Sequence, residues 1–168
     1  MTQRTLASVF CTALLAATAV AATPLHAKWP AWLTIESPVN AFDQASRGAL
    51  LLVHAQMREG QTKASDLDGS AEGLVNGARK SLKLHFEPTS HPNVYAMRTQ
   101  WPAEGTWVLR IALASTTAIV TLKPDGTVAS TRIPTYAQGS WQIPSPVTDR
   151  DIDAALAAAA GATTTAKR

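Results

Sequence analysis

Turn signals recur along most of the chain and divide it into short segments. Asn76-Gly77 and Pro124-Asp125-Gly126 each separate two stretches rich in apolar and β-branched residues. Asn-Gly is the strongest local signal for a two-residue hairpin, because both residues tolerate a positive φ. Turn signals at intervals of about 8–12 residues, with no long amphipathic helix between the strands, favour an all-β antiparallel sandwich.

The segments between the turns show the patterns of strands. Residues 106–113 alternate, placing Trp107 and three later apolar side chains on one face, so we expect Trp107 to fill the space between two sheets. Residues 49–53 are apolar throughout, which predicts a strand covered on both faces. The other predicted strands are residues 33–36, 70–75, 78–86, 94–100, 117–123 and 127–133.

The end of the chain predicts one short helix. Thr148 is a good N-cap, and three aspartates in the first turn complement the helix dipole. Ile152 and Leu156 are the only large apolar residues among alanines, so we expect weak docking. We expect Gly161 to end the helix and residues 162–168 to form a disordered tail.

The first 27 residues have the pattern of a secretory signal peptide. Arg4 is followed by an apolar stretch at 6–22 and by a small-residue cleavage site at Leu25-His26-Ala27, with Val20-Ala21-Ala22 as a second acceptable site. The stretch is shorter than the roughly 20 residues of a spanning helix, so we expect no membrane span after cleavage. The expected parts are the signal peptide (1–27), the sandwich (28–146), and the helix and tail (147–168), in a periplasmic or secreted protein.

Composition excludes several classes of protein. A chain that is 46% hydrophobic and 16% charged is not an intrinsically disordered one. The net charge of +3 is dispersed, so we expect no nucleic-acid partner. The single cysteine, Cys11, lies within the predicted signal peptide. The exported chain is therefore expected to have no disulfide, catalytic cysteine or thiolate zinc site.

One stretch resembles a known family. Asn93-Val94-Tyr95-Ala96-Met97, a turn through Pro102 and Glu104, and Gly105-Thr106-Trp107-Val108-Leu109-Arg110-Ile111 resemble the G-x-Y and G-x-W-x-L/V-x-I/V motifs of the YtkA-like family. Asn93 replaces the first glycine of that pattern and also tolerates left-handed backbone. The resemblance implies a small exported domain with an immunoglobulin-like β-sandwich fold. Some relatives are thought to assist copper or cytochrome assembly, and many have no assigned role.

The residues of this stretch also support structural predictions of their own. We expect Tyr95 to bury its ring and to donate its hydroxyl to a backbone carbonyl. Gly105 lets the chain turn just before the strand that carries Trp107.

A copper site is the alternative that the residues leave open. Imidazole and thioether ligands suit copper, and His85, His91 and Met97 supply both kinds. They would converge only through tertiary folding, and the methionine-rich pattern expected of a copper-handling relative is missing. On this alternative the protein is a periplasmic metal-binding or assembly protein with copper as its ligand; otherwise we expect no cofactor.

Tryptophan is abundant, with five residues in the chain. Trp29 lies near the expected mature N-terminus, Trp101 in a turn and Trp141 in a late loop. Exposed aromatic side chains stack on sugars or anchor protein partners. These three residues are therefore the candidate partner-binding residues, although they could instead plug the open ends of the sandwich.

The sequence thus predicts an exported, non-catalytic β-sandwich that acts as a binding or accessory module of the cell envelope. We expect an envelope or extracellular protein as the partner, recognised by the loops 57–67, 87–93 and 100–105. A small hydrolase is a second alternative, built from distant serine, histidine and aspartate residues. The sequence has no G-x-S-x-G elbow, because Gly69-Ser70-Ala71-Glu72-Gly73 has its serine one position early.

Overall fold

The structure is a computed structural model that describes residues 31–57 and 60–166, with side chains up to residue 161. The predicted signal peptide, Cys11 and Trp29 lie outside the described residues.

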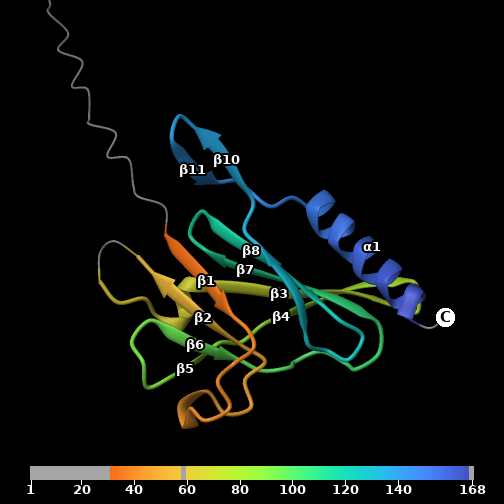
Figure 1. Ribbon diagram of the computed structural model, residues 1–168, viewed down its shortest axis with the longest axis horizontal. Helices are drawn as coiled ribbons and strands as arrows, with labels where there is room; N and C mark the ends of the chain where they lie inside the picture. The colour runs from red at the N-terminus through yellow and green to blue at the C-terminus, as the bar shows by residue number, and fades with distance from the viewer. Residues whose placement is uncertain (1–30, 58–59, 167–168) are drawn as a thin grey trace, which may run out of the picture.

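Two antiparallel sheets make up most of the molecule (Figure 1). The strands are β1 (Trp32–Glu36), β2 (Leu51–Gln56), β3 (Leu67–Val75), β4 (Ala78–Lys83), β5 (Glu87–Pro88), β6 (Val94–Met97), β7 (Thr106–Leu113), β8 (Thr116–Leu122), β9 (Val128–Arg132), β10 (Thr135–Gln138) and β11 (Trp141–Pro144). One sheet has the order β1-β2-β6-β5, and the other has the order β4-β3-β7-β8-β9. Two 3₁₀ turns, η1 (Gln44–Ser46) and η2 (Ala64–Asp66), lie in the connections.

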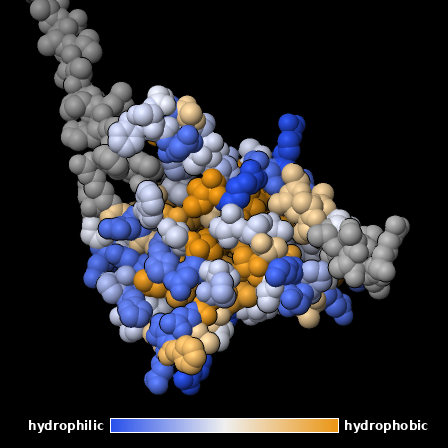
Figure 2. Space-filling model, in the orientation of Figure 1, coloured by the Kyte–Doolittle hydropathy of each residue, from blue (hydrophilic) through white to orange (hydrophobic). Residues whose placement is uncertain are grey.

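The two sheets share one hydrophobic core. Every second residue of β7 points into it, beginning with Trp107, and β2 contributes Leu51 and Val53 from the opposite sheet. Trp107 is 4% exposed, and its indole N–H donates to the carbonyl of Glu104 at 2.9 Å. Figure 2 shows hydrophobic residues in the middle of the visible face, with hydrophilic residues around them. The predicted core position of Trp107 is confirmed.

Both predicted hairpins are present. Val75 of β3 pairs with Ala78 of β4, and the two residues between them, Asn76 and Gly77, have φ of 52° and 78°. These positive values are those of the predicted type I′ turn. In the turn between β8 and β9, the carboxylate of Asp125 accepts the backbone N–H of Thr127 at 2.9 Å. Local turn chemistry therefore sets the register of both hairpins.

The helix α1 (Asp149–Ala166) covers the outer face of the five-stranded sheet (Figure 1). Ile152 and Leu156 pack against Val108 of β7 and Ile119 of β8, and they are 2% and 5% exposed. The narrow apolar stripe is therefore buried, and the expectation of weak docking is not supported by this packing.

The predicted end of the helix at Gly161 is wrong. The helix continues through this residue to Ala166, so residues 162–166 are helical rather than a disordered tail. A glycine that ends a helix adopts a left-handed conformation. Gly161 does not have the positive φ of such a cap.

Polar contacts tie the helix to the sheet. The backbone N–H and the hydroxyl of Thr148 both donate to the carboxylate of Asp151, at 2.9 Å and 2.7 Å. Arg79 of β4 contacts both Asp153 of the helix and Glu72 of β3. The two hydrogen bonds from Thr148 hold the pKa of Asp151 below its usual value.

Glu72 is a second carboxylate that the fold keeps ionised. Its burial favours the protonated form, but hydrogen bonds from Ser81 and Ser70 and the charge of Arg79 outweigh burial and lower the pKa of Glu72. The hydroxyl of Ser81 donates to the carboxylate at 2.7 Å.

The hairpin of β10 and β11 was not predicted. Gln138 pairs with Trp141, and Gly139, with φ of 61°, and Ser140 form the two-residue loop between them. Figure 1 shows the hairpin projecting from the two sheets. Gly-Ser between two strands is itself a hairpin signal. Each arm has only four residues, which left little alternation to detect.

We predict that Gly73→Ala strongly destabilises the protein. Gly73 pairs with Trp107, and a Cβ at this position would overlap the six-membered ring of the indole. Overpacking of this kind costs about 1–3 kcal/mol, measured as the free energy of unfolding in urea. The matched control is Gly161→Ala, where a Cβ meets nothing within 4 Å. The control is expected to keep or increase stability, and a Gly73→Ala variant as stable as the wild type would contradict the packing described here.

We predict that acid destabilises the protein partly through Asp151 and Glu72. The pKa of each is lowered by folding, so each ionised carboxylate stabilises the fold above its unfolded pKa, near the ordinary values of 3.8 and 4.5. This contribution disappears as the pH falls through the folded pKa. The double variant Asp151→Asn, Glu72→Gln is expected to lose less melting temperature between neutral and acidic pH than the wild type, as followed by circular dichroism. Equal losses in the two proteins would rule out this role.

Candidate functional site

The outer faces of the two sheets differ. The helix α1 covers the outer face of the five-stranded sheet, whereas much of the four-stranded sheet presents side chains to solvent. Thr34 of β1 pairs with His54 of β2, which pairs in turn with Val94 of β6. Residues that pair in this way share one face of a sheet. These side chains therefore lie together on the outer face.

A shallow groove of about 640 Å³ runs along this face, and we call it the outer groove. It is lined by Trp32, Thr34, Ile35, Glu36, His54, Ala55, Gln56, Pro92, Asn93 and Val94.

Trp32 lies in the outer groove as an exposed aromatic side chain. It is 69% exposed, and it pairs with Gln56 on the neighbouring strand. Its indole N–H donates to the hydroxyl of Thr34 at 3.0 Å. This bond orients the ring, and Trp32 presents a large apolar surface to solvent.

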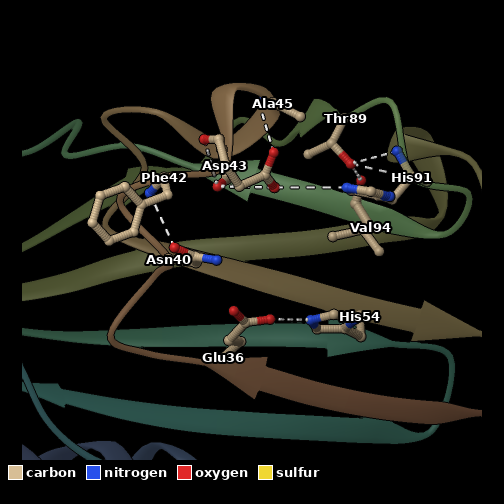
Figure 3. A network of polar contacts seen from close by, with 10 residues as sticks. Glu36, Asn40, Phe42, Asp43, Ala45, His54, Thr89, His91 and Val94 are labelled. Carbon is tan, nitrogen blue, oxygen red and sulfur yellow. Dashed lines mark hydrogen bonds and ion pairs between the residues drawn. The ribbon is translucent and has the colours of Figure 1, made fainter.

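His54 and Glu36 form a polar pair in the same groove. The Nε2 atom of His54 lies 2.8 Å from Oε2 of Glu36, and each side chain is 41% exposed. Figure 3 shows the two side chains pointing toward one another from neighbouring strands. The contact is a hydrogen bond when the imidazole is neutral and an ion pair when it is protonated. The pair is both positioned and accessible to a ligand.

Residues 37–50, which we call the crossing segment, connect β1 to β2 and reach the turn between β5 and β6. Asp43 caps the 3₁₀ turn η1 through a hydrogen bond from the Ala45 N–H at 3.0 Å. The same carboxylate lies 3.6 Å from Nε2 of His91 in the β5–β6 turn (Figure 3). Arg98 donates to the carbonyl of Arg47 at 2.8 Å. The crossing segment is therefore tied to both ends of β6.

Buried and partly buried hydrogen bonds hold the wall of the outer groove formed by residues 92–94. Asn93 has φ of 62°, and its side-chain oxygen accepts the backbone N–H of Thr62 at 2.8 Å. Tyr95 is 4% exposed and donates its hydroxyl to the carbonyl of Thr62 at 2.5 Å. The prediction for Tyr95 is confirmed, and Asn93 adopts the left-handed backbone that asparagine tolerates. These bonds connect the groove wall to the segment around Thr62.

The tryptophans selected from the sequence have different positions. Trp101 is 7% exposed, which does not fit an exposed partner-binding residue. With Trp107 it lines a cavity of about 300 Å³ between the β6–β7 connection and the β8–β9 turn. Trp101 therefore helps to close one end of the sheets, which was the alternative that the sequence allowed. Trp141 is 61% exposed but belongs to β11 rather than to a loop, and Trp29 lies outside the described residues.

Trp32 was missed as a candidate, although its signal is present. The predicted strand begins at Leu33, so Trp32 falls just outside it. Extending the alternation back by one position places Trp32 on the same face as Thr34 and Glu36, opposite the buried Leu33. The side-chain contact between His54 and Glu36 had no local signal, because it depends on the register between β1 and β2.

The three residues of the copper alternative are placed differently in the fold. Met97 is fully buried in the core, whereas His85 and His91 are exposed. The backbone of His85 bonds the side chain of Gln100, and His91 faces Asp43. Across residues 31–57 and 60–166, no group of three or more histidine, cysteine, aspartate or glutamate residues is arranged to hold a metal ion.

No protein-family model, curated protein or solved structure matches the chain. Within the part that the structure describes, no helix has the length and apolar character needed to cross a membrane.

We predict that Tyr95→Phe destabilises the protein by about 1–2 kcal/mol, because it leaves the buried carbonyl of Thr62 without this hydroxyl donor. The free energy of unfolding in urea measures the effect. Tyr136→Phe is the matched control, since Tyr136 is 50% exposed, and its stability should stay within about 0.5 kcal/mol of the wild type. Equal effects at the two positions would contradict the buried hydrogen bond.

Proposed function

We propose that this chain is an exported, non-catalytic binding module of the cell envelope. One observation carries the proposal. The outer groove combines the exposed and positioned ring of Trp32 with the accessible pair of His54 and Glu36. An aromatic surface beside a few polar groups in a concave site is the usual composition of a binding site.

We also propose that the two sheets are an immunoglobulin-like sandwich, as the resemblance to the YtkA-like family implies. The antiparallel pairing, the shared core and the buried Trp107 support this assignment. The buried Tyr95 and the left-handed Asn93, which belong to the motif, support it as well. Export is supported by the signal-peptide pattern of residues 1–27.

The shape of the outer groove favours binding over catalysis. Catalytic groups act most strongly where water is excluded, because a low dielectric strengthens electrostatic stabilisation. His54 and Glu36 are instead in a shallow groove and are both substantially exposed. They are suited to donate and accept hydrogen bonds with a bound partner.

Photo-crosslinking in the organism that makes the protein tests this proposal. A benzophenone amino acid replaces Gln56, which pairs with Trp32, and in a control it replaces Lys83, which is exposed on β4 of the other sheet. Illumination is expected to join an envelope component to position 56 and not to position 83. The absence of a product at position 56, or the same products at both positions, would contradict a binding role for the outer groove.

A further inference from the structure

We infer that the outer groove binds a neutral saccharide chain, with the ring of Trp32 as the stacking platform. This inference rests on the proposed binding function and names the chemical class of the ligand. It follows from three properties of the groove, which are its aromatic surface, its polar side chains and its charge.

The aromatic surface suits one face of a sugar ring. A pyranose presents C–H groups on its face, and these groups pack on an electron-rich indole. Trp32 is exposed enough to accept such a ring, and the hydrogen bond to Thr34 holds the indole in place before the ligand arrives. A platform that is already ordered loses less conformational entropy on binding.

The polar side chains suit the hydroxyl groups at the edge of the same sugar ring. Glu36 uses Oε2 for His54, and its other carboxylate oxygen can accept a ligand hydroxyl. Gln56 is exposed opposite Trp32, and its amide can both donate and accept. A ligand stacked on Trp32 would therefore meet hydrogen-bonding groups on the neighbouring strand.

The size and charge of the groove favour a neutral saccharide over a protein. Protein interfaces commonly bury about 800 Å² per partner and have an apolar centre. The outer groove has a volume within the range of small-ligand sites, about 300–1,000 Å³, and its large apolar side chains are few. Glu36 is the single carboxylate among the lining residues, none of which is a lysine or arginine, so no cluster of charges of either sign selects an ionic polymer.

Isothermal titration calorimetry of the purified exported chain tests this inference. The probes are chitotriose, which has the N-acetylated sugar of peptidoglycan, and cellotetraose and maltotetraose, which represent glucose chains of two linkages. At least one probe is expected to bind. Trp32→Ala should weaken that binding by roughly tenfold or more, the loss of a well-placed aromatic contact, and Trp32→Phe should retain part of it.

The matched control is Trp141→Ala, which removes a second mostly exposed tryptophan from among the residues that the structure describes, in β11. It should bind the probe as the wild type does, and both alanine variants should keep the far-ultraviolet circular dichroism and the melting temperature of the wild type. Failure of the wild type to bind any probe, or equal losses in the two alanine variants, would overturn the inference.

If the calorimetry fails while position 56 still crosslinks to an envelope protein, the saccharide inference is wrong and the binding function stands. If both experiments fail, both proposals are wrong.

Discussion

The contact between Trp107 and Gly73 is the constraint on which the rest of the fold depends. The indole lies over Gly73 of β3, which has no side chain. This lets a large ring fit between the two sheets. Gly105, with φ of 95°, turns the chain just before the strand and comes close to Val75. The chain has a single cysteine and so cannot form an internal disulfide. Its stability therefore depends on apolar burial of this kind.

The strand that carries Trp107 also explains why the two outer faces differ. One face of β7 supplies the shared core, and Val108 on its other face packs under α1 with Ile152. The helix thus occupies the outer face of the five-stranded sheet. The crossing segment is tied to the β5–β6 turn and the end of β6, which leaves Trp32, His54 and Glu36 accessible beside it. The outer groove is therefore a consequence of which faces the connections cover.

Local signals were sufficient for much of this architecture. The Asn76-Gly77 turn, the bounds of β7 and the buried hydroxyl of Tyr95 were all predicted, because turn chemistry and alternation act over a few residues. The sequence left open whether Trp101 is buried or exposed, because an aromatic residue in a turn is covered or exposed depending on segments distant in sequence. The path of the helix beyond Gly161 likewise depends on context, because glycine tolerates helical as well as left-handed backbone.

The candidate site depended even more on tertiary structure. Trp32 could have been found by extending one alternating pattern by a single residue, but its neighbours in the groove come from other strands. The side-chain contact between His54 and Glu36 follows from the register of β1 with β2, which composition and spacing do not define. Spacing likewise did not define the environments of His91 and Met97. They are six residues apart in the sequence, yet His91 is exposed and Met97 is buried in the core. The sequence pattern of a strand alone does not predict which face of the sheet a connecting segment will cover.

The most direct test of this account is the solvent exposure of the individual indole groups. A two-dimensional ¹⁵N–¹H spectrum resolves tryptophan Nε1–H signals, and a soluble gadolinium chelate broadens those near the surface. The signals of Trp32 and Trp141 are expected to broaden strongly, and those of Trp101 and Trp107 are expected to be protected. A protected Trp32 would remove the binding platform, and a broadened Trp107 would contradict the shared core.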